Sequence, residues 1–279
     1  MEVPFFNHFL KDNGDISKIK EVNLFDTGSH EWKDFDTYNP TNTVDTALYL
    51  QPNGSLSFKN PPTDKTLNAP RQYVSNPWKP VPYTQKITLN YPRDFMTEDQ
   101  RFAATRPDVL VYQTDVLTED ITVAGDIKPK LFISSSGTDS DFVVKVIDVF
   151  PDDYVFPEGV KPPLTSAFSV FQPGGYQMLL RGEPMPARFR NSFEKPEPLK
   201  PNVVTKLNYT MPGIVHTFKK GHRIMVQIQS TWFPLVARNP QKFVANYKLG
   251  TNADFQLATE SVFSSSTYPS AIVLTVSKK

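Results

Sequence analysis

The sequence predicts an all-β protein folded as a two-sheet jelly-roll sandwich. Three observations support this prediction: many short segments alternate like strands, few segments have a helical period, and the long connections are rich in proline. Proline accounts for 26 of the 279 residues and glycine for only 12. Because 21 phenylalanines and 11 tyrosines need a core, the proline excess indicates stiff loops rather than disorder.

The N-terminal segment predicts a short amphipathic helix. Its large apolar side chains are spaced so that they share one helical face: Phe5, Phe6, Phe9 and Leu10. Pro4 suits the first turn of this helix, and Asn13 with the glycine after it suits the end. A helix this short is marginal alone in water, and no comparable helix follows to cover it. We therefore expect it to pack on the sandwich or to self-associate, and we treat 1–14 as a unit apart from one sandwich over 15–279.

Strand-like segments follow from Lys20 onward, separated by clusters of glycine, proline or asparagine. They are 20–26, 46–51, 55–58, 71–75, 109–114, 120–125, 129–136, 141–150, 222–230 and 271–277. The Pro-Asn-Gly sequence at 52–54 is a tight hairpin signal between two of them. In the last two segments, alternation predicts inward-facing side chains: Ile224, Val226, Ile228, Ile272, Leu274 and Val276.

Helices are a minor component of the predicted fold. One internal helix is expected over roughly 98–105, because Thr97 and Gln100 have capping-box spacing and Pro107 ends it. The connection 151–202 holds ten prolines. We expect this connection to wrap around the sandwich rather than to supply a central strand, because proline cannot donate to a strand ladder.

Composition excludes several classes of protein. With 30 Lys+Arg against 29 Asp+Glu, the net charge of +1 favours neither a nucleic-acid partner nor an electrostatic membrane anchor. There is no cysteine, which excludes thiolate zinc sites, cysteine nucleophiles and disulfides. No segment has the ~18 apolar residues of a membrane-spanning helix. The start, MEVPFFNHFLKD, has neither a basic n-region nor a small-residue cleavage site, so we do not interpret it as a signal peptide.

The motifs of hydrolytic chemistry are absent from the sequence. The nucleophile elbow G-x-S-x-G does not occur, and the serines at 134–136 are predicted to end a strand and begin a turn. The four histidines have no zinc-ligand spacing. We expect His8 to be a surface or docking residue and His30 to lie in a solvated loop. His216 and His222 flank a turn, and we expect structural roles with a ring nitrogen bonded to backbone.

Two groups of loop residues remain as candidates for binding. Four aspartates flank the segment 141–150: Asp139, Asp141, Asp152 and Asp153. Carboxylates that cap their own turns are commoner than a Ca²⁺ site, so we assign no metal and no other cofactor. Three aromatic residues lie in the proline-rich loop YVSNPWKPVPY: Tyr73, Trp78 and Tyr83. They are expected either to line a ligand cleft or stack on a sugar, or to pack in a core.

Several segments, taken in order, resemble one family. They are VPFFNHFLK (3–11), YVSNPWKPVPY (73–83), the stretch 106–152, RFRNSF (188–193) and HTFKKGHRIMVQIQSTWFPLVARNP (216–240). This set resembles the C-terminal domain of the α/β-hydrolase serine enzymes that include cocaine esterase, α-amino-acid ester hydrolases, glutaryl-7-aminocephalosporanic-acid acylases and X-Pro dipeptidyl-peptidases. The most specific matches are 106–152 and the pattern F-K-x-G-H-R-I…S-x-x-F-P…R-N-P.

The resemblance implies a galactose-binding-like jelly roll. It also implies that 1–14 is the remnant of the last helix of a hydrolase domain whose serine, aspartate and histidine lie upstream, so the chain resembles a fragment of a larger hydrolase. No catalytic residue can be carried over. The loop 73–83 is implied to lie near the junction with the catalytic domain, which makes Tyr73, Trp78 and Tyr83 candidates for the acyl-pocket wall. The family often has aspartate where this chain has Asn76, so a charge-dependent role at 76 is in doubt.

Two functions remain open. The first is the non-catalytic domain of a periplasmic or secreted serine hydrolase that acts on esters, β-lactam side-chain amides or X-Pro peptides. In this case the partner is the catalytic domain, and Phe5, Phe6, Phe9 and Leu10 dock between domains. The second is a stand-alone carbohydrate-binding module. The apolar N-terminal helix favours the first, because a free module has no use for it; pairing with a second copy stays open.

Overall fold

The computed structural model describes residues 2–17, 19–38, 40–64, 69–86, 88, 93–156, 164–166, 169–170 and 174–278. Within these residues, a larger sheet of eight strands contains β3 (Thr43–Leu50), β4 (Leu56–Ser57), β5 (Arg71–Ser75), β7 (Ile121–Ser135), β12 (Thr205–Asn208), β13 (Met211–Phe218), β15 (Ala258–Phe263) and β16 (Ala271–Ser277). A smaller sheet contains β6 (Leu110–Gln113), β8 (Asp141–Val149), β11 (Gln177–Pro186) and β14 (Arg223–Gln229). Two-stranded sheets pair β1 (Val22–Asp26) with β2 (Glu31–Phe35), and β9 (Leu164–Ser166) with β10 (Ser169–Val170). The helices are α1 (Glu2–Lys11), α2 (Arg101–Ala104), η2 (Arg93–Thr97), η3 (Ala187–Phe189), η4 (Tyr247–Leu249) and η5 (Asn252–Asp254).

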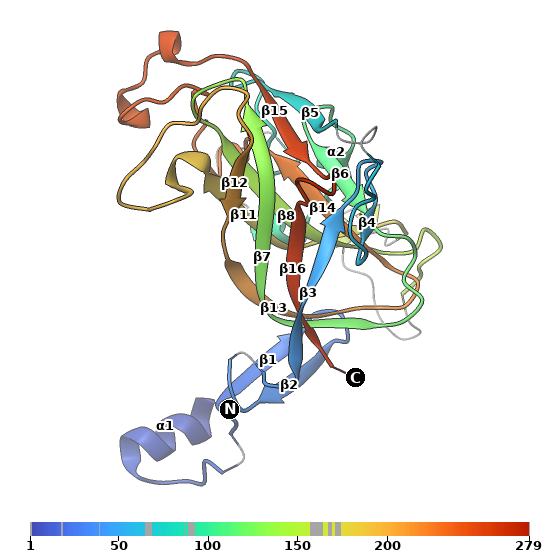
Figure 1. Cartoon of the computed structure of the whole chain (residues 1–279). Coiled ribbons are helices and arrows are strands. Elements are labelled where there is room, and N and C mark those ends of the chain that lie inside the picture. Colours follow the sequence, from blue (N-terminus) through green and yellow to red (C-terminus); the bar gives the residue numbers. More distant parts are fainter. Residues whose placement is uncertain are drawn as a thin grey trace.

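The two large sheets pack against each other as a sandwich (Figure 1). The order β4-β3-β16-β7-β15-β5 describes one sheet, with β12 and β13 also paired to β7, and β11-β8-β14-β6 describes the other. Their named strand pairs are antiparallel, as expected where hairpins and long loops connect the strands. The predicted all-β, two-sheet sandwich is confirmed.

One hydrophobic core fills the space between the sheets. The predicted inward side chains of β14 and β16 lie in it: Ile224, Val226, Ile228, Ile272 and Leu274 are fully buried, and Val276 packs at its edge. The facing side chains of β8 complete this layer with Phe142, Val144 and Val146. The strand register predicted from alternation is therefore confirmed.

Strand β7 runs unbroken through a stretch predicted as two strands. Gly125 adopts a positive φ of 139°, and Pro129 lies where the neighbouring strand changes. Strand β13 pairs with β7 as far as Ile127, and β12 takes over at Lys130. Pro129 therefore faces the gap between two neighbours, where a missing N–H breaks no ladder bond on that side.

A third layer covers the outer face of the smaller sheet. The proline-rich segment 76–86 and the segment after β14 place Val81, Tyr83 and Trp232 over outward side chains such as Val111 and Val143. The predicted internal helix begins later than expected, at Arg101. Gln100 is its N-cap, but the Gln100 side chain accepts a hydrogen bond from buried Lys145 at 3.0 Å and makes no cap bond. The capping box expected from Thr97 is therefore wrong, because a long-range contact takes its glutamine.

The proline-rich connection 151–202 supplies the edge strand β11, and its described residues supply no central strand of the two large sheets, as expected. Pro184 and Pro186 lie in β11, which pairs only with β8 along the sheet order. Edge strands tolerate proline because one side of the ladder is unpaired. No helix in the described part of the chain is long and apolar enough to cross a membrane.

The N-terminal residues extend away from the sandwich. Figure 1 shows α1 beyond the β1–β2 hairpin, at the end of the molecule where the N-terminus lies. None of the residues of α1 is buried, and Phe5, Phe6, Phe9 and Leu10 are 42%, 52%, 57% and 75% exposed. The expected packing of this helix on the sandwich is therefore absent, and its association with another molecule stays a prediction.

Candidate functional site

The three aromatic residues predicted to line a pocket do not share one surface. Tyr73 lies on β5 with its ring in the main core, and its hydroxyl shares a 2.7 Å hydrogen bond with Ser230 Oγ. Burial raises the pKa of Tyr73 well above the ordinary value for a phenol. Tyr83 is also buried, where it packs edge-on against Phe95 and beside Trp232. Trp78 alone of the three is open to solvent, with 52% of its surface exposed.

The loop that carries Trp78 is braced by its neighbours. Asn76 Oδ1 accepts a hydrogen bond from the Trp78 backbone N–H at 2.9 Å and so closes a turn. The neutral amide of asparagine closes such a turn as well as the carboxylate of aspartate does. Arg238 donates to the Pro77 carbonyl at 2.9 Å, and its guanidinium lies over the rings of Phe233 and Phe255. The loop therefore presents Trp78 from a fixed support, and Asn76 acts there through its local hydrogen bond.

A buried polar cluster joins β8, β15 and three loops at one end of the sandwich. Arg188 Nε and Nη2 reach Asp139 Oδ2 at 2.8 and 2.6 Å, and the Tyr247 hydroxyl donates to the same oxygen at 2.8 Å. Asn239 donates to Asp141 Oδ1 at 2.8 Å. Burial raises the pKa of Asp141 to about 7. These bonds hold the loops that follow η3 and β14, and sequence reasoning missed all of the partners.

Glu260 extends this polar cluster into the large sheet. It is fully buried, accepts a hydrogen bond from Ser135 Oγ at 3.0 Å, and faces the amide nitrogen of Gln241 at 2.9 Å. Burial, together with the nearby carboxylates of Asp141 and Asp139, raises the pKa of Glu260 to about 8. Among the described residues, no group of three His, Cys, Asp or Glu side chains is placed to hold a metal ion. The cluster is suited to fixing loops rather than to ligating a metal.

A second buried cluster places one carboxylate between two histidines. Asp148 on β8 contacts His216 Nε2 at 3.2 Å and His222 Nδ1 at 2.9 Å. Burial opposes the ionisation of Asp148, but the hydrogen bonds from both imidazoles outweigh it and lower its pKa. The other nitrogen of His216 bonds Thr27 Oγ1 at 2.8 Å. The structural role predicted for the two histidines agrees with this burial, although their partners are side chains rather than backbone.

Hydroxyl, imidazole and carboxylate thus line up from Thr27 through His216 to Asp148, the order used in nucleophilic catalysis. His216 is only 1% exposed, however. A substrate would need a position beside both the hydroxyl and a set of oxyanion donors. Neither of the surface hollows described below includes any of the three residues. The alignment therefore joins the hairpin to the sandwich through an imidazole that is closed off from solvent.

The turn between β1 and β2 is fastened at the same place. Asp26 is fully buried, and its carboxylate accepts the Thr217 N–H at 2.8 Å and lies 2.6 Å from Lys33 Nζ. Burial opposes its ionisation, but these bonds hold the pKa of Asp26 well below its usual range. A Cβ on Gly28 would lie 2.0 Å from the Thr217 carbonyl oxygen, so only glycine fits this approach. We call Asp26, Thr27, Gly28, His216 and Thr217 the hairpin latch.

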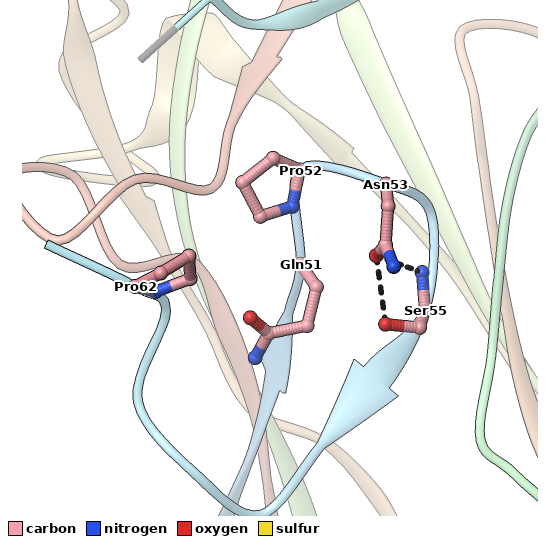
Figure 2. Close-up of a pocket in the computed structure, with 5 residues that line it drawn as sticks. All are labelled: Gln51, Pro52, Asn53, Ser55 and Pro62. Atoms are coloured by element: carbon pink, nitrogen blue, oxygen red, sulfur yellow. Dashed lines mark hydrogen bonds between the residues drawn. The ribbon is translucent and has the colours of Figure 1, made fainter. Parts of the chain in front are cut away.

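Two of the hollows on the surface of the described residues differ in place and lining. One, of about 270 Å³, lies at the β3–β4 turn between Gln51, Pro52 and Pro62 (Figure 2). Its polar groups serve the turn itself: Asn53 Oδ1 accepts from the backbone N–H and hydroxyl of Ser55, as the dashed lines in Figure 2 mark. The Gln51 amide donates to the Lys59 carbonyl at 3.0 Å. This hollow is the inside of a hairpin connection and presents no catalytic group.

The other hollow, of about 490 Å³, is a groove between the end of β11, η3 and the β12–β13 turn. Phe189 and Phe193 lie along it with nearly parallel rings, and Phe193 is 77% exposed. Two of its polar side chains, Arg190 and Asn191, bond Glu197 within their own loop. The groove offers an aromatic wall but no nucleophile with a base beside it.

Comparison with known proteins identifies the family to which the sandwich is similar. The family described as X-Pro dipeptidyl-peptidase C-terminal non-catalytic domain matches residues 15–273. Cocaine esterase from Rhodococcus sp. (strain MB1 Bresler) is 28% identical over 287 residues, covering 100% of this chain and 46% of that protein. The resemblance to the C-terminal part of this hydrolase family, expected from the sequence, is confirmed.

Two solved structures are similar over nearly the whole chain. An aminopeptidase from a marine sediment Thaumarchaeota archaeon superposes with a TM-score of 0.88 at 38% identity, covering 100% of this chain and 44% of its own. An α-amino acid ester hydrolase superposes with a TM-score of 0.86 at 35% identity, covering 98% and 44%. The chain thus spans less than half the length of these relatives. With 15–273 matched, the chain belongs to the family of X-Pro dipeptidyl-peptidase C-terminal non-catalytic domains.

Proposed function

We propose that this chain is the non-catalytic part of a serine hydrolase of the α/β-hydrolase class, and that it packs against the catalytic domain of that enzyme. One observation carries the proposal: α1 presents Phe5, Phe6, Phe9 and Leu10 to solvent with no cover from the described residues of the chain. Burying each such side chain is worth roughly 1.5–3 kcal/mol, so together they favour a partner strongly.

The relatives' lengths support the same partner. Each match covers about the same share of a longer protein, 44% or 46%, and the relatives are named as an esterase, an aminopeptidase and an ester hydrolase. We propose that 1–14 belongs structurally to the catalytic domain and that 15–279 is the accessory sandwich. The parent enzyme would be an acylase, ester hydrolase or X-Pro dipeptidyl-peptidase, acting in the periplasm or outside the cell.

The accessory sandwich is proposed to help form the wall of the acyl pocket. Trp78 is the residue best suited to this role, because its ring is exposed on a loop braced by Asn76 and Arg238. Tyr73 and Tyr83 would support this wall from within the core, since their rings are buried. Replacing Trp78 by alanine in the parent enzyme should alter KM among substrates that differ in their acyl group more than it alters kcat.

The proposal is tested first on the chain alone. Purified protein should not turn over p-nitrophenyl acetate or Gly-Pro-p-nitroanilide above background, because the sequence has no nucleophile elbow and the imidazole of the Thr27–His216–Asp148 alignment is only 1% exposed. Saturable turnover that persists through contaminant controls would overturn the non-catalytic assignment. Titration of the chain with the catalytic domain of its parent, produced separately, should show association, and its absence would overturn the packing proposal.

A carbohydrate-binding module is the second candidate. It is favoured by the exposed ring of Trp78 and by the groove beside Phe193. Sugars stack on exposed aromatic faces, so a bound sugar should protect Trp78 from fluorescence quenching. Protection of Trp78 by a sugar, together with no association with a catalytic domain, would favour this candidate over the first.

A further inference from the structure

The β1–β2 hairpin has two chemically different faces. Cross-strand register pairs Leu24 with Lys33 and Asp26 with Glu31 on one face. The other face carries the pairs Asn23–Asp34 and Phe25–Trp32. Since residues directly opposite in an antiparallel pair share a face, each pair marks one side of the ribbon.

The first face is fixed to the sandwich by the hairpin latch. The Asp26 carboxylate accepts both the backbone N–H and the hydroxyl of Thr217, at 2.8 and 2.5 Å. The Thr27 hydroxyl bonds His216, and the Thr27 N–H donates to the Val215 carbonyl at 3.3 Å. A two-stranded hairpin is barely stable alone, so these bonds give this one its orientation.

The second face carries an exposed aromatic pair, Phe25–Trp32, beside the polar pair Asn23–Asp34. Trp32 is 63% exposed and Phe25 is 40% exposed. Their rings meet edge-to-face with centroids 5.5 Å apart, so each aromatic surface is preorganised by the other. Apart from His30, whose ring lies 6.4 Å from that of Phe25, no other aromatic ring is paired with them in the described chain. A paired, rigid and exposed aromatic surface is typical of an interface anchor.

We infer that this outward hairpin face is a second docking surface for the catalytic domain, with Trp32 and Phe25 as its anchors. The inference rests on the proposed function, which supplies the partner. The hairpin is the next element after α1 in sequence, and Figure 1 shows both at the same end of the molecule, with the hairpin between α1 and the end of the large sheet. A partner that covers α1 is therefore the nearest candidate to cover the hairpin. The part of each relative that this chain does not cover, more than half of its length, is large enough to be such a domain.

The test measures association of the 279-residue chain with the separately produced catalytic domain of its parent by isothermal titration calorimetry. Trp32→Ser should weaken association about tenfold or more, as removal of an anchor does. Trp32→Phe should recover most of the affinity. Phe193→Ser is the matched control, because Phe193 is also a largely exposed aromatic residue, 77% against 63% for Trp32, but lies in the loop after η3. It should bind like the unmodified chain, and the melting temperature of each variant should stay within error.

The possible results separate the inference from the proposed function. If Trp32→Ser binds normally while the triple variant Phe5→Ser, Phe6→Ser and Phe9→Ser does not bind, the catalytic domain docks on α1 alone and the inference is wrong. The inference is also wrong if Phe193→Ser weakens binding equally, or if Trp32→Ser abolishes only self-association measured by analytical ultracentrifugation. If the unmodified chain does not bind the catalytic domain at all, the proposed function itself fails.

Discussion

Replacing Asp26 with alanine should release the β1–β2 hairpin while the two sheets stay folded. The Asp26 carboxylate is fully buried and accepts hydrogen bonds from Thr217 on β13 and from the backbone N–H groups of Gly28 and Ser29, at 2.9 and 3.0 Å. Lys33 adds an ion pair at 2.6 Å. Alanine removes every acceptor at this point.

The size of the effect follows from which donors remain buried. In the docked hairpin of the variant, the buried N–H of Thr217, which is 4% exposed, has lost its acceptor. The N–H groups of Gly28 and Ser29 can bind water when the hairpin detaches from the sandwich. Removing one member of a buried charged pair costs ~3–5 kcal/mol. The docking of the hairpin should weaken by about that amount. The free energy of unfolding of the sheets should change less, because the main core contains no residue of β1 or β2.

Hydrogen exchange followed by mass spectrometry measures this difference directly. A loss of about 3 kcal/mol corresponds to roughly a hundredfold faster exchange of the amides in β1 and β2, with β14 unchanged. Asp34→Ala is the matched control, because Asp34 lies on the outward face of the same hairpin and bonds only Asn23 among the described contacts. Unchanged exchange in the hairpin of the Asp26 variant, or an equal increase in β14, would refute the reasoning.

Acid should reproduce the effect of the Asp26 substitution. The folded-state pKa of Asp26 lies below its unfolded value of ~4, so its contribution to stability is present above that pH. As the pH falls below ~4, the unfolded chain takes up a proton first and the contribution is lost progressively. The exchange rate of the hairpin in the unmodified chain should therefore rise progressively below pH ~4 and approach that of the Asp26 variant as the pH nears the lowered folded-state pKa.

Three further predictions concern the sandwich itself. Ile228→Ala should lower the free energy of unfolding by ~2–5 kcal/mol in urea titrations, since Ile228 is fully buried between the sheets; a loss below ~1 kcal/mol would contradict this packing. Arg188→Ala should cost ~3–5 kcal/mol, because Asp139 would be left as a buried charge, and Arg188→Ala with Asp139→Asn should recover part of that loss. Glu260 has a folded-state pKa of about 8, above its unfolded value, so stability should fall as the pH rises from 5 to 8; Glu260→Gln should flatten this slope, and an unchanged slope would contradict the assignment.

Local pattern predicted the strands whose two faces differ in polarity or whose ends carry turn signals. β14 and β16 set their apolar side chains toward the core because alternation and burial agree there. The break predicted within β7 was wrong, because Pro129 signals a turn unless its neighbours are known. The helix near Thr97 began late for a similar reason: buried Lys145, more than forty residues away, takes the side chain of Gln100.

The candidate site depended on contacts that spacing does not encode. Tyr73, Trp78 and Tyr83 lie within eleven residues, yet the fold sends two rings into the interior and leaves one outside. The partners of Asp139 come from positions 188 and 247, and no periodic pattern links them. The partners of a buried charge can therefore be recognised only once the fold has brought distant loops together. An unusual number of polar residues beside the end of a strand does indicate, from the sequence, that such a cluster is present.

The hairpin shows why an interface is hard to recognise from sequence. A strand with Phe25 and Trp32 opposite each other would ordinarily be assigned an inward aromatic face. In this chain the inward face is instead the one with Asp26, because the latch provides donors that offset the cost of burying its charge. Burying the carboxylate turns the aromatic pair outward. The same polar contacts that hold the hairpin to the sandwich therefore expose the surface that we propose binds a partner, and they keep it rigid enough to bind without a large loss of conformational entropy.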